Sequence, residues 1–171
     1  LRRQRQMCIR DSYQAGKSYK VKVVNGQGKA LANQTVKINI NGVIYNRVTD
    51  ENGIAKLNIN LRPGNYILTA TDPETGLDIG FNITVLPTII AENLTTYLNA
   101  SQFNASFVKG NGNPLSNTNV TFNINGVFYI CQSDDNGLAT LNINLMPGKY
   151  IITAIEPVTG LDMGYGVTVL K

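Results

Sequence analysis

Apolar residues occupy every second position in several short stretches of this chain, most clearly in 119–125 and 138–145 and again in 35–40 and 55–61. A period of two predicts β-strands that bury one face and leave the other in water. No segment shows the longer period of an amphipathic helix, so the sequence predicts an all-β protein. In the second half of the chain we expect strands near 92–97, 103–109, 119–125, 127–133, 138–145, 149–155 and 161–170.

Residue pairs that favour tight turns lie between these stretches. Asn41-Gly42 and Asn125-Gly126 each separate two apolar strands, and a two-residue type I′ hairpin needs positive φ at both of its positions. Asparagine and glycine adopt that conformation more readily than other residues. Further turns are expected at Asp50–Gly53, Pro63-Gly64, Asp134–Gly137 and Pro147-Gly148, because these residue types are typical of turns.

The chain contains an internal repeat. A shift of 84 residues aligns Val24–Leu86 with Val108–Leu170 without a gap and gives 36 identities in 63 positions. A period of this size indicates tandem copies of one structural unit. Similarity resumes at Tyr13, opposite Tyr97, so the first copy lacks the counterpart of the second copy's first strand.

We therefore expect two domains, residues 13–87 with a truncated first strand and residues 88–171 complete. The linker between them is at most Pro87–Ala91, and it contains proline and β-branched residues rather than glycine and serine. That composition favours an extended, semi-rigid connection.

Two sheets of alternating strands can cover each other's apolar faces and form a sandwich. Tyr66 and Tyr150 each follow a Pro-Gly turn at the start of an expected strand. In immunoglobulin-like sandwiches a tyrosine at this corner ties its hydroxyl to the backbone a few residues upstream. The sequence thus predicts two tandem immunoglobulin-like β-sandwich domains.

The first twelve residues do not fit the repeat. Residues 2–12 contain four arginines without strand or helix periodicity, and they resemble the translation of a sequencing-library adapter. We expect residues 1–12 to be non-native and to lie outside the fold. Without their four arginines and one aspartate the net charge falls from +4 to +1. No basic surface for nucleic acid remains, and Cys131 is left without a disulfide partner.

The composition excludes most enzyme chemistry. The chain has no histidine, which removes the usual general base and the commonest transition-metal ligand. Asp134 and Asp135 could form a carboxylate pair, but both lie in an expected turn, where acidic residues are ordinary turn formers. We expect no catalytic residues, no cofactor and no small-molecule substrate.

Calcium is the more plausible use of the same acidic residues, because it binds hard oxygen ligands. The candidate ligands lie in the Asp50–Asn52 and Asp134–Asn136 turns and at Asp72 and Asp78. These turns lack an EF-hand's spacing and distal glutamate. We therefore assign no metal site and leave calcium open as the alternative to plain turn chemistry.

The lysines and the cysteine of the repeats offer two possible sites of covalent chemistry. An isopeptide bond between Lys20 or Lys22 and Asn82 is not favoured, because the set is not repeated in the second copy and no acid occupies an apolar strand position to promote it. Cys131 replaces Arg47 of the first copy, which indicates a partly exposed thiol without a cationic neighbour and without a tuned reactivity.

N-glycosylation is the one modification that the sequence suggests repeatedly. The chain has 22 asparagines and six Asn-X-Ser/Thr sequons, and such a site must be secreted and exposed to be used. The alternative is that asparagine and threonine simply line the outer faces of the sheets. The candidate asparagines are Asn33, Asn82, Asn93, Asn99, Asn104 and Asn119.

The repeated motifs suggest a family. The run GxGxPLxNxxVxFxINGVFY, the D-x-N-G turn, LNINLxPGxYxITA and TGLD resemble the repeats of adhesin-like surface proteins of methanogenic archaea. They are more loosely similar to the modules of bacterial invasin-type adhesins. This resemblance implies an extracellular, cell-surface protein in which the repeats act as a structural spacer beside neighbouring repeats. The alternative is that the domains themselves bind glycans, cell-wall components or surface proteins of a host or partner cell.

Overall fold

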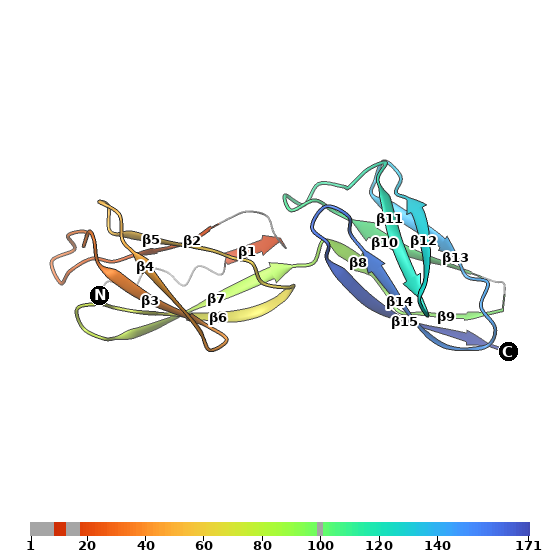
Figure 1. Ribbon diagram of the computed structural model, residues 1–171, viewed down its shortest axis with the longest axis horizontal. Coiled ribbons are helices and arrows are strands. Elements are labelled where there is room, and N and C mark those ends of the chain that lie inside the picture. Colours follow the sequence, from red (N-terminus) through yellow and green to blue (C-terminus); the bar gives the residue numbers. More distant parts are fainter. Residues whose placement is uncertain (1–8, 13–17, 99–100) are drawn as a thin grey trace. The chain divides into compact units, whose positions relative to one another are not determined.

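The computed structural model describes residues 9–12, 18–98 and 101–171 of the chain. Every helix or strand assigned in this part is a β-strand, so the all-β prediction is confirmed. The chain divides into two compact units, Leu1–Leu86 and Pro87–Lys171 (Figure 1). The predicted boundary therefore differs from the structural one by a single residue.

The second domain is a sandwich of two sheets. One sheet has three strands in the order β13-β10-β8, and the other has five in the order β12-β11-β14-β15-β9. The chain passes repeatedly between the sheets, as in an immunoglobulin-like fold. Its strands are β8 (Ile89–Ala91), β9 (Leu94–Tyr97), β10 (Gln102–Phe107), β11 (Asn119–Ile124), β12 (Val127–Gln132), β13 (Leu138–Asn142), β14 (Gly148–Ile155) and β15 (Asp162–Leu170).

The first domain repeats this arrangement. Its larger sheet has the order β1-β7-β6-β3-β4, and β2 pairs with β5 in the smaller sheet. Each hairpin and each crossing between sheets has its counterpart 84 residues later. The strands are β1 (Ile9–Ser12), β2 (Ser18–Lys22), β3 (Thr35–Ile40), β4 (Val43–Val48), β5 (Ile54–Asn58), β6 (Gly64–Thr71) and β7 (Asp78–Leu86).

The structure differs from the prediction at the start of the chain. Residues 9–12, which we expected outside the fold, form β1 and pair in parallel with the end of β7, from Ile83 to Leu86. In the second domain β9 pairs in the same way with the corresponding residues of β15. The first domain therefore has a strand where its first strand was expected to be missing. That residues 1–12 are non-native stays a prediction, and residues 1–8 lie outside the described part.

The structure also corrects the extent of the linker. Ile89–Ala91 forms β8 and pairs antiparallel with Ala105–Phe107 of β10. Ile89 is fully buried, and so is Thr88 just before it. Since β7 ends at Leu86, two residues separate the last strand of one domain from the first strand of the next.

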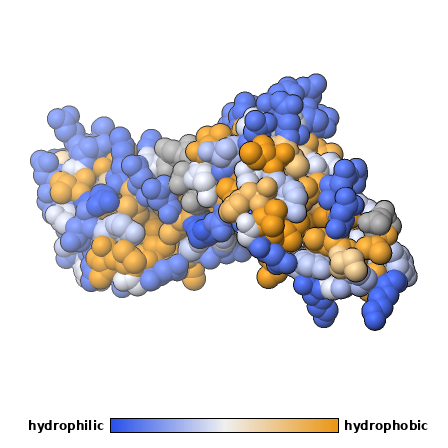
Figure 2. Space-filling view, turned by 45° about the vertical axis from the view of Figure 1, so that its right-hand side comes forward, coloured by the Kyte–Doolittle hydropathy of each residue, from blue (hydrophilic) through white to orange (hydrophobic). Residues whose placement is uncertain are grey.

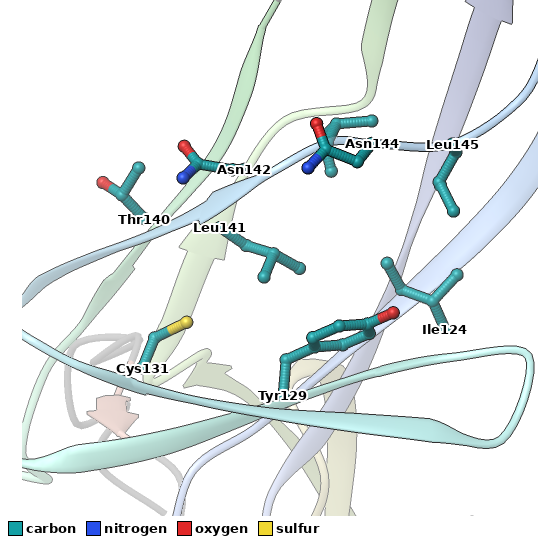
Figure 3. Close-up of a pocket in the computed structure, with 9 residues that line it drawn as sticks. Ile124, Tyr129, Cys131, Thr140, Leu141, Asn142, Asn144 and Leu145 are labelled. Carbon is teal, nitrogen blue, oxygen red and sulfur yellow. The ribbon is translucent and has the colours of Figure 1, made fainter. Parts of the chain in front are cut away.

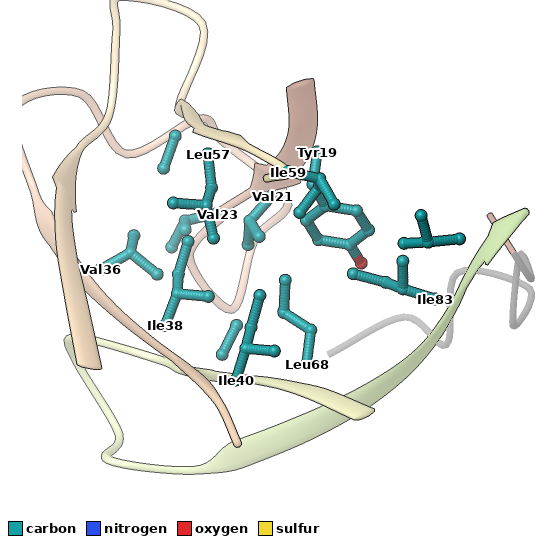
Figure 4. Close-up of a cluster of buried hydrophobic side chains, with 13 residues drawn as sticks. Tyr19, Val21, Val23, Val36, Ile38, Ile40, Leu57, Ile59, Leu68 and Ile83 are labelled. Atoms are coloured by element: carbon teal, nitrogen blue, oxygen red, sulfur yellow. The ribbon is translucent and has the colours of Figure 1, made fainter. Parts of the chain in front are cut away.

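The apolar residues of alternate strand positions meet in the core of each domain. In the first domain, side chains from β2 and β5 face those from β3, β6 and β7 (Figure 4). Ile38 and Leu57 are almost fully buried, which confirms the predicted register of their strands. Leu68 and Ile83 of β6 and β7 are buried as well. In the second domain Phe122 occupies the place of Ile38 and is also fully buried.

Each core contains a contact between a tyrosine and a phenylalanine, but the two residue types are on opposite strands in the two domains. Tyr19 on β2 contacts Phe81 on β7, with ring centroids 5.8 Å apart. At the equivalent positions of the second domain Phe103 contacts Tyr165, at 5.7 Å. The hydroxyl therefore changes strand between the repeats. In the second domain it donates a hydrogen bond of 3.2 Å to the carbonyl of Ile89 and so ties β15 to β8.

The Tyr19 hydroxyl makes the first domain sensitive to alkali. The residue is 5% exposed, and burial raises the pKa of its hydroxyl from 10.0 to about 12. The unfolded chain loses this proton at lower pH than the folded domain. This contribution to stability is therefore intact below about pH 10 and is lost as the pH rises toward 12.

We expect Tyr19→Phe to remove that alkaline loss. A shift of two pKa units corresponds to about 2 kcal/mol of stability at pH 11.5. Urea titrations at pH 9 and pH 11.5, followed by circular dichroism, should show a smaller loss in the variant by this amount. Tyr97→Phe, which removes a 62% exposed tyrosine, is the matched control and should keep the wild-type loss. Equal losses in wild type and Tyr19→Phe would contradict the prediction.

The corner tyrosines and the hairpin turns are as predicted. The hydroxyl of Tyr66 donates to the carbonyl of Arg62 at 2.7 Å, and that of Tyr150 donates to Met146 at 2.9 Å. Both residues of the turn between β11 and β12 have positive φ, 52° at Asn125 and 84° at Gly126, as a type I′ turn requires. The turn between β3 and β4 has the same conformation.

Candidate functional site

The two acidic turns use their first aspartate to hold the backbone. The Asp134 carboxylate accepts hydrogen bonds from the N–H groups of Asn136 and Leu138, both at 2.8 Å. Asp50 accepts the equivalent pair at 2.9 Å. This arrangement is the ordinary Asx turn. The second acid of this turn has a different partner, since Asp135 accepts a hydrogen bond from the side-chain amide of Asn117.

The other candidate calcium ligands also have partners within the protein. One oxygen of Asp72 accepts bonds from the N–H groups of Glu74 and Thr75, and Asp78 accepts one from the Thr71 hydroxyl. Within residues 9–12, 18–98 and 101–171 no three acidic or cysteine side chains gather as a metal site would require. These carboxylates therefore stabilise turns and strands by hydrogen bonds within the protein.

Sequence reasoning missed a buried carboxylate. Glu156 follows β14 and is 2% exposed. It accepts hydrogen bonds from the N–H groups of Val158 and Thr159, at 2.6 and 2.9 Å, and from the Thr159 hydroxyl. Leu161 beside it is fully buried, whereas its counterpart Leu77 is 51% exposed. The signal in the sequence was the exchange of an aspartate for the longer glutamate, and the result is a fixed loop rather than a reactive site.

The residues that an isopeptide bond would join lie on different sheets. Lys20 alternates with buried residues of β2 and is exposed, and the same holds for Lys22. Asn82 is exposed on β7, which belongs to the other sheet. Since each side chain points away from the core, the two sheets separate the lysines from the asparagine. The structure therefore excludes this bond in the folded domain.

Five of the six sequon asparagines lie in the described residues, and all five are exposed. Asn93 and Asn104 use their side-chain oxygens within the protein, accepting from the Gly166 N–H at 2.7 Å and from the Thr140 hydroxyl at 2.8 Å. Asn33 has a positive φ of 55°. Asn99 lies outside the described residues. Exposure is compatible with glycan attachment, which stays a prediction.

The second domain has an open groove along one side of its sandwich. It lies where the edge strand β12 of one sheet faces the edge strand β13 of the other, and its volume is about 310 Å³. The side chains of Tyr129 and Cys131 point from β12 toward Leu141 on β13 (Figure 3). We call this hollow the edge groove. Its lining residues are Ile124, Tyr129, Cys131, Thr140, Leu141, Asn142, Ile143, Asn144 and Leu145.

Two exchanges distinguish the edge groove from its counterpart: Arg47 and Lys56 of the first domain stand where the groove has Cys131 and Thr140. In the first domain Arg47 occupies the position of Cys131, and its guanidinium lies over the ring of Tyr45, 5.6 Å from the centroid. Cysteine is shorter and carries no charge. Burial raises the pKa of the Cys131 thiol, so the thiol is a poorer nucleophile than an exposed one at neutral pH. The groove therefore offers an aromatic ring and amides to a ligand but no activated group.

Both domains also present hydrophobic residues at the surface (Figure 2). In the second domain they concentrate on β12, where Phe128 is 63% exposed and Ile130 is 72% exposed. Exposed apolar residues grouped in this way indicate contact surfaces rather than random exposure. No helix in the described part of the chain is long and apolar enough to cross a membrane.

No model of a protein family matches the chain, and no curated protein sequence matches it. Among solved structures it is similar to the fibronectin(III)-like modules of Clostridium thermocellum CbhA, with 15% identity over 98% of this chain and 92% of that one and a TM-score of 0.32. It is similar to titin A168169 with 13% identity over 96% of this chain and 95% of that one, at a TM-score of 0.32.

A third similar structure is Bacteroides ovatus SGBP-B, from a mixed-linkage glucan utilization locus and in complex with a mixed-linkage heptasaccharide. The identity is 17% over 99% of this chain, with a TM-score of 0.34, and the chain spans 44% of that protein's length. At such identities these similarities concern the fold alone. The fold itself, two tandem immunoglobulin-like β-sandwiches, follows from the strand order and register of each domain.

Proposed function

We propose that the chain is part of an extracellular adhesin-like protein of the cell surface, in which its two domains serve as structural repeat modules of a stalk. The stalk would hold a distal binding region away from the cell. Its partners would be neighbouring repeats of the same protein. The resemblance to repeats of methanogenic archaea and the adapter-like origin of residues 1–12 belong to the same proposal.

The observation that supports this role is that the two domains share the features of a scaffold and do not share a binding site. Both domains share the strand order of the five-stranded sheet, the Asx turns, the type I′ hairpin and the corner tyrosine, and 36 of 63 aligned residues are identical. These shared features stabilise a scaffold. Two residues separate the strands that end one domain and begin the next. A short connection between repeated rigid modules is what a stalk requires.

One observation favours the alternative, a ligand-binding domain. The edge groove of the second domain places Tyr129 near Asn142 and Asn144, and an aromatic face with amide groups can bind a glycan or a peptide. The first domain has Arg47 over the equivalent tyrosine. The two domains therefore differ at the place where a ligand would bind.

Binding measurements separate the two functions. The full chain, immobilised through its C-terminus, is exposed to a panel of neutral and acidic polysaccharides and to intact cells. A stalk module should show no saturable binding. Saturable binding that Tyr129→Ala abolishes, while the matched Tyr45→Ala of the first domain does not, would replace the stalk by the ligand-binding function.

Solution scattering tests the stalk proposal independently. A single compact particle of 171 residues would have a radius of gyration of about 15–16 Å. A stalk segment should give a clearly larger value, about 21–23 Å for two modules joined end to end. A value near 15 Å for the full chain would contradict the stalk role whatever the binding measurements show.

A further inference from the structure

The β12 strand combines a free sheet edge with an apolar sequence. It is the terminal strand of the five-stranded sheet. None of its six residues, VFYICQ, is charged, and none is proline or glycine. Charged residues, prolines, bulges and short length are the usual means by which edge strands avoid pairing with another chain. Within the described residues β12 carries none of them along its whole length.

The backbone of β12 can pair on its open side. Ser133, directly after the strand, donates its N–H to the carbonyl of Thr118 at 2.9 Å. Backbone groups of an antiparallel strand alternate between its two sides with every residue. The groups of residues 127, 129 and 131 therefore face β11. Those of Phe128, Ile130 and Gln132 face the open edge.

The first domain is protected at the same place. Its edge strand β4 has Arg47 where β12 has Cys131, and Asn46 where β12 has Ile130. A charged residue on an edge strand opposes pairing because a second strand would have to cover it. Four of the six residues differ between the two edge strands, and the charged Arg47 is the difference that protects the first domain's edge.

We propose that β12 pairs antiparallel with β12 of a second copy of this chain, about a two-fold axis. Pairing through the open backbone groups requires that Phe128, Ile130 and Gln132 of one copy lie opposite the same set in the other. One such register places each Phe128 opposite Ile130 of the other copy and Tyr129 opposite its own counterpart. A shift by one step in one direction would place Phe128 opposite a polar residue, Gln132, and a shift in the other direction would place Ile130 opposite Gly126, which has no side chain. Both registers are disfavoured.

The area of the edge fits a weak dimer. The exposed fractions are 52% for Val127, 63% for Phe128, 38% for Tyr129 and 72% for Ile130. With roughly 150–250 Å² for a whole aromatic side chain, these fractions amount to on the order of 400 Å² per copy. Two copies would thus bury about 800 Å² in total, which is below the area of stable complexes and in the range of weak, transient ones. This inference does not depend on the proposed stalk role.

The state of association of the full chain tests the pairing. Sedimentation velocity over a concentration series, under reducing conditions, should show a mass that rises from 18.6 kDa toward twice that value. Ile130→Lys should abolish the rise, since it places a charge on the edge at a position that is 72% exposed and therefore tolerant of substitution. The matched control is Asn46→Lys on the equivalent edge of the first domain, which should dimerise as the wild type does. A chain that stays monomeric up to millimolar concentration would overturn the proposal, and so would an equal effect of the two lysines.

The register has its own test. In a chain with Cys8 and Cys131 replaced by serine, Tyr129→Cys should give a disulfide-linked dimer on oxidation, because residues opposite each other about the axis have Cα atoms within disulfide range. Gln132→Cys on the same background should not. Linkage through position 132 instead of 129 would overturn the proposed pairing. Circular dichroism and thermal melting confirm that each variant is folded.

Discussion

Replacing Gly137 by alanine is expected to lower the free energy of unfolding of the second domain by about 2–5 kcal/mol. The residue has a φ of 78°, and an added Cβ would lie 2.4 Å from the carbonyl oxygen of Phe107. An L-residue in this conformation costs about 1–2 kcal/mol, and forcing an extra carbon into a packed site costs about 1–3 kcal/mol more. The chain therefore uses glycine here for close approach as well as for turn conformation.

The carbonyl in question cannot simply move aside. Phe107 accepts the N–H of Leu115 at 2.9 Å through this oxygen and donates its own N–H to Gly137 at 2.8 Å. A shift at position 137 would thus disturb both hydrogen bonds. The first domain has the same arrangement, in which a Cβ on Gly53 would lie 2.5 Å from the carbonyl of Val23.

Gly126→Ala is the matched control for this prediction. Its φ of 84° resembles that of Gly137, but a Cβ there would meet nothing within 4 Å. We expect it to cost only the conformational part, about 1–2 kcal/mol. Urea titrations of the full chain, monitored by circular dichroism, give both values from the transition of the second domain. Equal losses in the two variants would show that the close approach to Phe107 has no energetic consequence.

The features that sequence reasoning placed correctly are those set by local chemistry. Asn125-Gly126 forms the expected turn because few other residue pairs tolerate positive φ twice. The corner hydrogen bond of Tyr150 follows from its place after the Pro-Gly turn. Alternation of apolar residues predicted that Phe122 faces the core, since its strand is buried on one face and its register is fixed by that face.

The features that it missed depend on contacts far apart in the chain. β8 is three residues long, and its β-branched residues are as typical of a stiff linker as of a strand. The sequence of this segment alone therefore does not predict that it pairs with β10. Residues 9–12 do not resemble the repeat, yet they occupy the place beside β7 that β9 occupies beside β15. Comparison of the repeats shows that one copy lacks the sequence of a strand, but it does not show which unrelated residues occupy that strand's place.

The edge groove could not be predicted from the sequence for a similar reason. The run of apolar residues in β12 is typical of a strand buried on both faces, whereas the structure places it at the edge of a sheet with four of its side chains more than a third exposed. The exchange of Arg47 for Cys131 was visible in the aligned repeats. That Cys131 lines a groove against β13 depends on how the two sheets lie, which alternation along one strand does not reveal.

Phe122→Ala is expected to lower the free energy of unfolding of the second domain by about 3–5 kcal/mol, the largest effect of a single substitution proposed for this chain. The side chain is fully buried. Its ring lies 5.8 Å from that of Phe103, in an edge-to-face arrangement at 88°, and 6.1 Å from that of Phe107. Both partners belong to β10 of the opposite sheet. The three rings therefore hold the two sheets together, and truncation would leave a cavity between them.

The control is the same substitution on the neighbouring strand. Phe128 is 63% exposed, and Phe128→Ala should change the stability by no more than about 0.5 kcal/mol at concentrations where the chain is monomeric. Urea titration followed by circular dichroism should show the transition of the second domain shifted in Phe122→Ala and that of the first domain unchanged, because Phe122 lies in the second unit. A loss below about 1 kcal/mol for Phe122→Ala would mean that the sheets pack without this ring, since even modest cavities in a core cost more than that.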